Sequence, residues 1–193
     1  MMDARRASMR GVAARTVIAP TLAAVALAVL ALAGMVGQAS ADDACDHFAW
    51  DVTRVRAAFA TPVTALAAAT APGTMPMLEP DRLYELTLAP QRQVAFVKPP
   101  DKKALPDGAF AGLVHLHVPA AGKYRVAMDN GFWIDVIAGG QFVATDDFTG
   151  NRECSAPRKM VQYLLPAGND LVLQFSGASA PKVRVTLTAA PAP

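Results

Sequence analysis

Residues 122–145 read GKYRVAMDNGFWIDVIAGGQFVAT, and this stretch decides the fold. It holds short runs of strand-forming residues separated by Asp-Asn-Gly and Gly-Gly, which favour tight turns because Gly and Asn accept left-handed backbone conformations. Connections this short join antiparallel neighbours, since a parallel crossover needs about a dozen residues or more. The stretch therefore predicts part of an antiparallel sheet.

The same two-residue alternation extends from Arg82 onward, as is typical of a sandwich or barrel. The expected strands are residues 82–88, 93–97, 111–118, 122–129, 132–138, 141–145, 158–165, 170–176 and 182–188. Alternation also assigns faces. The sets expected on the core face are Val114, Leu116 and Val118 in one strand and Val183, Val185 and Leu187 in another. We predict a mainly β protein whose residues 81–189 form an antiparallel β-sandwich of jelly-roll type with one N-terminal helix.

Residues 42–80 are expected to form that helix and a strap. Phe48, Val52, Val55 and Phe59 recur at helical spacing, which predicts a helix over Asp46–Ala60 with Asp51 or Thr53 capping its second half. Residues 61–80 are rich in Ala, Thr and Pro and indicate a loop, with one further helical turn over Leu66–Ala69. Residues 190–193 are expected to be a disordered tail.

The first 41 residues have the order of a cleavable signal peptide. Arg5, Arg6, Arg10 and Arg15 precede the uncharged run 22–36, and Ala39-Ser40-Ala41 supplies a small-residue cleavage site. A retained anchor is the alternative, but the apolar run is shorter than the roughly 20 residues that cross a bilayer. We therefore expect a periplasmic or secreted protein with no stable membrane span after cleavage, and about 150 remaining residues suit one domain.

Removing the leader changes the meaning of the charge. The chain has 18 Lys and Arg and 16 Asp and Glu, of which four arginines and one aspartate lie in the leader, leaving 14 basic and 15 acidic residues. No basic stripe remains to neutralise phosphates, so nucleic acid is not an expected partner.

Cys45 and Cys154 are the only cysteines, and an even pair in an exported protein predicts a disulfide. Metal binding by the two thiolates is the alternative, but the chain has no CxxC spacing.

Three residue pairs are candidates for a site. His115 and His117 share the face opposite Val114 and Leu116, so they could bind a metal such as iron. No acid follows His117 within a few residues, and two half-exposed histidines on a sheet are the simpler interpretation.

Asp146 and Asp147 lie in an expected acidic loop that could bind calcium, although Asx-rich turns form without an ion. Trp133 and Asp135 share a strand face and could bind a sugar by stacking and hydrogen bonding. The alternative for Trp133 is a partly buried indole that covers the sheet edge.

The chain contains no G-x-S-x-G, Walker, H-E-x-x-H or GxGxxG motif. We therefore expect no catalytic residues and no cofactor, except calcium at the acidic loop or iron if the histidines bind metal.

Two stretches resemble known sequences. CDHFAWDVTRVRAAFA (45–60) and GKYRVAMDNGFWIDVIAGGQFVATDDFTGNRECSAPRKMVQYLLPAG (122–168) resemble an uncharacterised family of small secreted proteobacterial proteins, some of which carry the name homogentisate 1,2-dioxygenase. The second stretch is also similar to the β-sandwich of bacterial pre-peptidase C-terminal domains. The resemblance implies an exported β-sandwich. Dioxygenases of that name are cupin-type iron enzymes that use two histidines and a glutamate, and this chain has no matching Glu after His117.

The leading hypothesis is an exported, non-catalytic β-sandwich module that binds a glycan, another envelope component or a protein. The alternative is an iron-dependent dioxygenase of cupin-like type that uses His115 and His117.

Overall fold

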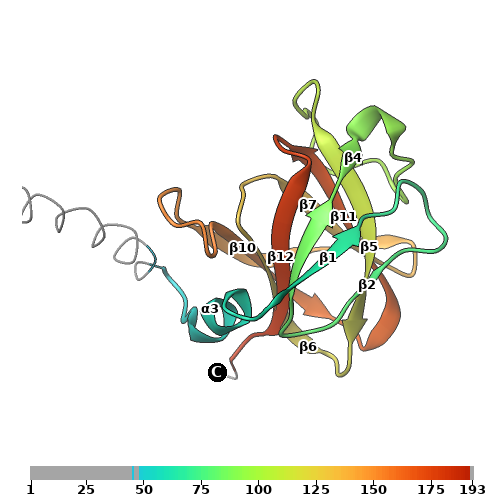
Figure 1. Ribbon diagram of the computed structural model, residues 1–193. Helices are drawn as coiled ribbons and strands as arrows, with labels where there is room; N and C mark the ends of the chain where they lie inside the picture. The colour runs from blue at the N-terminus through green and yellow to red at the C-terminus, as the bar shows by residue number, and fades with distance from the viewer. Residues whose placement is uncertain (1–44, 46–47, 192–193) are drawn as a thin grey trace, which may run out of the picture. The chain divides into compact units, whose positions relative to one another are not determined.

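The computed structural model describes Cys45 and residues 48–191, which form two stacked sheets and one short helix (Figure 1). The first sheet has the strand order β1 (Val63–Ala67), β3 (Leu83–Thr87), β12 (Lys182–Ala189), β6 (Gly122–Met128), β10 (Lys159–Leu165) and β9 (Thr145–Gly150). The second has the order β2 (Met77–Leu78), β5 (Phe110–Val118), β11 (Gly168–Ala178), β7 (Trp133–Ala138) and β8 (Gln141–Val143), and β4 (Ala89–Pro90) pairs with β5. The predicted leader lies outside the described residues.

The predicted jelly roll is confirmed by how the strands pair. β3 pairs with β12, β5 with β11, β6 with β10 and β7 with β8, and every one of these pairs is antiparallel. Within this series of eight strands the first therefore pairs with the last and the pairing proceeds inward, which is one long hairpin rolled across two sheets.

The core lies between the sheets and has the predicted faces. Val114 and Leu116 of β5 and Val185 and Leu187 of β12 are completely buried in it. Alternation identified these faces because each of these strands has one side on the shared core.

The helix is shorter than predicted. α3 covers Thr53–Phe59, and residues 48–52 are irregular. Asp51 Oδ1 accepts a hydrogen bond from the Thr53 N–H (2.9 Å), but the N-cap residue is Val52 and no side chain caps the helix from that position, so the predicted cap by Asp51 or Thr53 is wrong. Arg125 donates to the Asp51 carbonyl oxygen (2.6 Å) and stacks on Trp50 (4.7 Å), so tertiary contacts hold this segment against helical geometry.

α3 covers the outer face of the first sheet. Its Val55 and Phe59 pack against Leu83, Ala127 and Met160. The first sheet is therefore buried on both faces, and Thr186 and Thr188 of β12, which alternate with the core residues Val185 and Leu187, are buried as well.

The prediction of a loop over residues 61–80 is wrong in part. β1 pairs in parallel with β3, and β2 pairs in parallel with β5, so the sheets are mixed. The helical turn expected over Leu66–Ala69 is also wrong, because Leu66 and Ala67 belong to β1 and Ala69 bridges Leu113. The free backbone groups of two sheet edges outweigh the weak local preference of this Ala- and Thr-rich segment.

Two further strand predictions need correction. Residues 93–97 form no strand; a 3-10 turn, η1, covers Gln91–Gln93, and Val94 then packs on the outer face of the second sheet. The predicted acidic loop that holds Asp146 and Asp147 is the edge strand β9, because it pairs with β10. Pairing with a free edge outweighs the low strand preference of aspartate.

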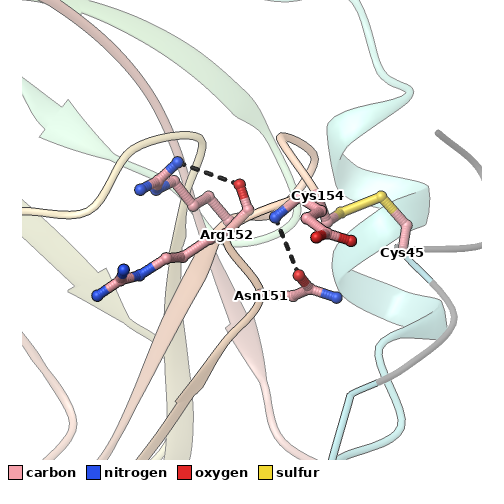
Figure 2. Close-up of a disulfide and its surroundings, with 6 residues drawn as sticks. Cys45, Asn151, Arg152 and Cys154 are labelled. Atoms are coloured by element: carbon pink, nitrogen blue, oxygen red, sulfur yellow. Dashed lines mark hydrogen bonds between the residues drawn. A yellow bond between two sulfur atoms is a disulfide. The ribbon is translucent and has the colours of Figure 1, made fainter.

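The predicted disulfide is present (Figure 2). Cys45 bonds to Cys154 with a Cα–Cα distance of 5.0 Å, which ties the N-terminal segment to the connection between β9 and β10. The described residues contain no helix that is long and apolar enough to span a bilayer. At the other end, the Ala190 N–H donates to the Lys123 carbonyl oxygen (2.9 Å), and residues 192–193 of the predicted tail lie outside the described part.

Candidate functional site

The predicted pair Trp133 and Asp135 does come together on β7. The indole Nε1 of Trp133 donates to Asp135 Oδ1 (2.8 Å). Asp135 Oδ2 accepts from Gln174 Nε2 (3.3 Å) and from the Asp101 backbone N–H (3.4 Å). Asp135 is only 6% exposed, and burial raises the pKa of its carboxyl. Asp135 therefore positions the indole, and a ligand would contact Trp133.

Trp133 borders an open groove between β7 and the edge of the first sheet, which we name the Trp133 groove. One lobe, of about 400 Å³, holds Asp146 and Asp147 and is named the acidic lobe. A second lobe, of about 550 Å³, holds Lys102, Arg152 and Arg158 and is named the basic lobe. Both lobes are bordered by Trp133, Phe148 and Lys159.

Phe148 adds a second aromatic ring to this groove. It lies on the edge strand β9 and is 69% exposed, more than any other large hydrophobic residue in the described part. A phenyl ring held in water beside an indole is a feature of ligand-contact surfaces. Sequence reasoning did not select Phe148; its position between Asp147 and Thr149, in a polar run, was the available signal.

In the acidic lobe the two aspartates differ. Asp146 Oδ2 accepts from Gln162 Nε2 (2.7 Å) and pairs with Lys123 Nζ (3.1 Å), and these contacts lower the pKa of its carboxyl. Among the described residues, the hydrogen bond that Asp147 Oδ1 accepts comes from the N–H of Phe148 (2.8 Å). Its other oxygen can accept a hydrogen bond from a ligand.

The predicted histidine pair lies elsewhere, on the outer face of β5. His117 Nδ1 contacts the carboxylate of Glu79, and Nδ1 of His115 is buried and has no hydrogen-bond partner among the described residues. Glu79 follows β2, whose parallel pairing with β5 brings it to His117. The expected acid was one that follows His117, whereas Glu79 precedes His117 by 38 positions.

The arrangement of possible ligand side chains gives little support to a metal site. In the part of the chain that the structure describes, no three His, Cys, Asp or Glu side chains gather closely enough to hold an ion. Calcium at Asp146 and Asp147 and iron at His115 and His117 therefore stay predictions that the geometry does not strengthen.

A separate hollow of about 450 Å³ lies among Pro90, Phe96, Pro106 and Phe110 under the loop that follows η1. Among its described lining residues, Arg92 and Asp107 are the charged ones, and none is a tryptophan or a histidine. It offers fewer groups for recognising a ligand than the Trp133 groove.

Comparison of the chain with models of protein families, with curated proteins and with solved structures found no match to any of them. The function is therefore argued from the site.

Proposed function

We propose that this protein is an exported, non-catalytic β-sandwich module that binds a glycan in the Trp133 groove. The observation that carries the proposal is the fixed, partly exposed indole of Trp133 beside the exposed ring of Phe148, in a groove that also holds carboxylates. Sugar rings stack their C–H faces on aromatic rings, and their hydroxyls donate to carboxylates.

The chemistry of the groove favours binding over catalysis. Its described lining contains no histidine and no cysteine. Asp135, the carboxyl with the raised pKa, is buried and bonded to Trp133 and Gln174, so it positions the indole. The Cys45–Cys154 disulfide supports export, because such bonds persist in oxidising compartments.

Truncation of the aromatic residues tests the proposal. The purified protein is screened on a panel of neutral and acidic oligosaccharides, and hits are titrated by calorimetry. We expect Trp133→Ala to weaken binding by about 10- to 100-fold, because truncating a central aromatic contact costs on the order of 2 kcal/mol. Phe148→Ala should weaken it less.

Leu164→Ala is the matched control for Phe148→Ala. Leu164 is 63% exposed, similar to Phe148, and does not line the groove. Its substitution should leave affinity unchanged, and circular dichroism verifies that each variant is folded. Unchanged affinity in both aromatic variants, or no binding to any saccharide of the panel, contradicts the proposal.

The iron-dependent dioxygenase is the second candidate, although His115, His117 and Glu79 do not form a three-residue metal-binding group in the described part of the chain. Glu79 supplies a carboxylate beside His117 that the sequence pattern did not reveal. This carboxylate is engaged with His117 itself. Iron bound by the purified protein, and lost from a His115→Ala/His117→Ala variant, would favour this alternative.

A further inference from the structure

The basic lobe of the Trp133 groove concentrates positive charge. Its lining includes Lys102, Arg152, Arg158 and Lys159, and none of its described lining residues is Asp or Glu. The chain as a whole is almost balanced, with 18 basic and 16 acidic residues. Four cations in one lobe are therefore a local feature, and they produce a positive potential at the groove.

These cations have no carboxylate partner among the described residues. Lys159 Nζ donates to the Phe132 carbonyl oxygen (2.8 Å), and Arg158 Nη1 donates to the Arg152 carbonyl oxygen (3.2 Å). Figure 2 shows the Arg152 side chain extending away from the disulfide. Lys102 is exposed and forms no ion pair with any residue that the structure describes.

Two of the ammonium groups lie over the ring of Trp133. Lys102 Nζ lies 5.9 Å and Lys159 Nζ 5.8 Å from the centre of the Trp133 ring. Burial lowers the pKa of Lys159, and the charge of Lys102 lowers it further. Two like charges beside one ring repel each other, and an anion bound between them would remove that repulsion.

The acidic lobe restricts what that anion can be. Asp146 and Asp147 lie on the other side of Trp133 and Phe148, where a continuous phosphate backbone would meet negative charge. A ligand that carries hydroxyls on one side and an anionic group on the other fits both lobes. An acidic saccharide has this distribution, and its rings can stack on the aromatic residues.

We propose that the Trp133 groove selects acidic saccharides of the uronic acid type. A sugar ring stacks on Trp133, its carboxylate lies between Lys102 and Lys159, and its hydroxyls donate to the acidic lobe. Arg152, which is exposed at the rim, draws the anion toward the groove. This inference rests on the proposed glycan binding and names the class of glycan.

The test compares two ligands that differ only in charge. Oligogalacturonate and the same oligomer with its carboxylates reduced to alcohols are titrated into the purified protein, with tryptophan fluorescence and calorimetry as readouts. We expect the acidic form to bind about 10-fold more tightly or better, since a charge-assisted hydrogen bond contributes more than 1 kcal/mol. The preference should shrink as salt is raised, because salt screens exposed charges.

Neighbouring lysines provide matched variants. Lys102→Gln should reduce affinity for the acidic oligomer about 10-fold and leave affinity for the reduced oligomer unchanged. Lys103→Gln makes the same charge change at the next residue, which is also exposed but does not line the groove, and should have no effect. Unchanged binding of the reduced oligomer verifies that the Lys102→Gln protein is folded.

The outcomes separate this inference from the proposed function. Equal affinity for the two oligomers, or an equal loss in Lys102→Gln and Lys103→Gln, overturns the selection of acidic saccharides and leaves glycan binding standing. An oligonucleotide serves as the anionic control. If neither oligomer binds, the acidic-saccharide inference is overturned, whether or not the oligonucleotide binds. Failure of the whole saccharide panel in addition overturns glycan binding.

Discussion

The carboxyl group of Asp135 is almost completely buried. Burial raises its pKa, against hydrogen bonds from Trp133 and Gln174 that act in the opposite direction. The folded state therefore holds the proton more tightly than the unfolded chain. The stability that Asp135 contributes is present below a pH of about 4, which is its pKa in the unfolded chain. This contribution is lost as the pH rises through the higher pKa that Asp135 has in the folded state.

Asp135→Asn tests this at the residue scale. We expect the free energy of unfolding of the wild type to fall more steeply than that of the variant as pH rises above about 4, measured by urea unfolding at several pH values. Asp107→Asn, in an exposed loop, should keep the wild-type slope. Identical slopes in all three proteins would show that Asp135 does not titrate differently on folding.

At the scale of residues, the sequence predicted Trp133 and Asp135 of the candidate site but not Lys102. The two-residue period placed Trp133 and Asp135 on one face, and their hydrogen bond confirms that. It could not show that Asp135 is buried, because Gln174 and the backbone of Asp101 come from distant segments. Lys102 was missed for the same reason, since the loop that carries it contacts β7 only in the folded chain.

At the scale of elements, the segment after β1 closely approaches Gly112 of β5. A Cβ atom there would lie 2.5 Å from Ala68 Cβ and 3.1 Å from Leu88 Cδ2. Gly112→Ala must push away the segment after β1 and weaken the pair of hydrogen bonds that joins Ala69 to Leu113. We expect it to lower the free energy of unfolding by about 1 to 3 kcal/mol, the usual cost of overpacking.

Gly122→Ala is the control for Gly112→Ala in the same urea or thermal unfolding experiment. Gly122 also lies in a strand, but its added methyl would meet only Tyr124 Cε2, at 4.0 Å. Its substitution should change stability by less than about 0.5 kcal/mol. Equal stability of the two variants would mean that the segment at Ala68 moves aside at no cost.

Long strands with a buried face were predictable as elements, and so was the short edge strand β8, but the short edge strands β1 and β2 were not. β5 and β12 alternate because one side of each lies on the core. β1 and β2 have no such alternation; they form because β3 and β5 offer free backbone groups, and their parallel direction depends on the path of the chain between them. Likewise, α3 begins later than predicted, at Thr53, because Arg125 binds the segment that precedes it.

For the whole molecule, both outer faces of the sandwich are covered by segments outside the eight jelly-roll strands. α3 packs on the first sheet, and the loop after η1 packs on the second through Val94, Phe96 and Val97. These covers leave the Trp133 groove at the open edge between the sheets. The N-terminal segment that precedes α3 is attached to the rest by the disulfide.

Removal of that disulfide should have a large effect on stability. Cys45 and Cys154 are 109 positions apart, so the bond restricts most of the unfolded chain, and its loss should lower the free energy of unfolding by about 4 to 5 kcal/mol. Urea unfolding of a Cys45→Ser/Cys154→Ser variant measures this. Reductant should reproduce the loss in the wild type and leave the variant unchanged.

The same variant links stability to binding. Cys154 belongs to the connection that also carries Arg152 and Arg158 into the basic lobe, so release of Cys45 should loosen these arginines. Affinity for the acidic oligomer should then fall more than affinity for its carboxyl-reduced form, at a temperature where the variant is still folded. Equal losses for both oligomers would mean that the disulfide stabilises the sandwich without positioning the basic lobe.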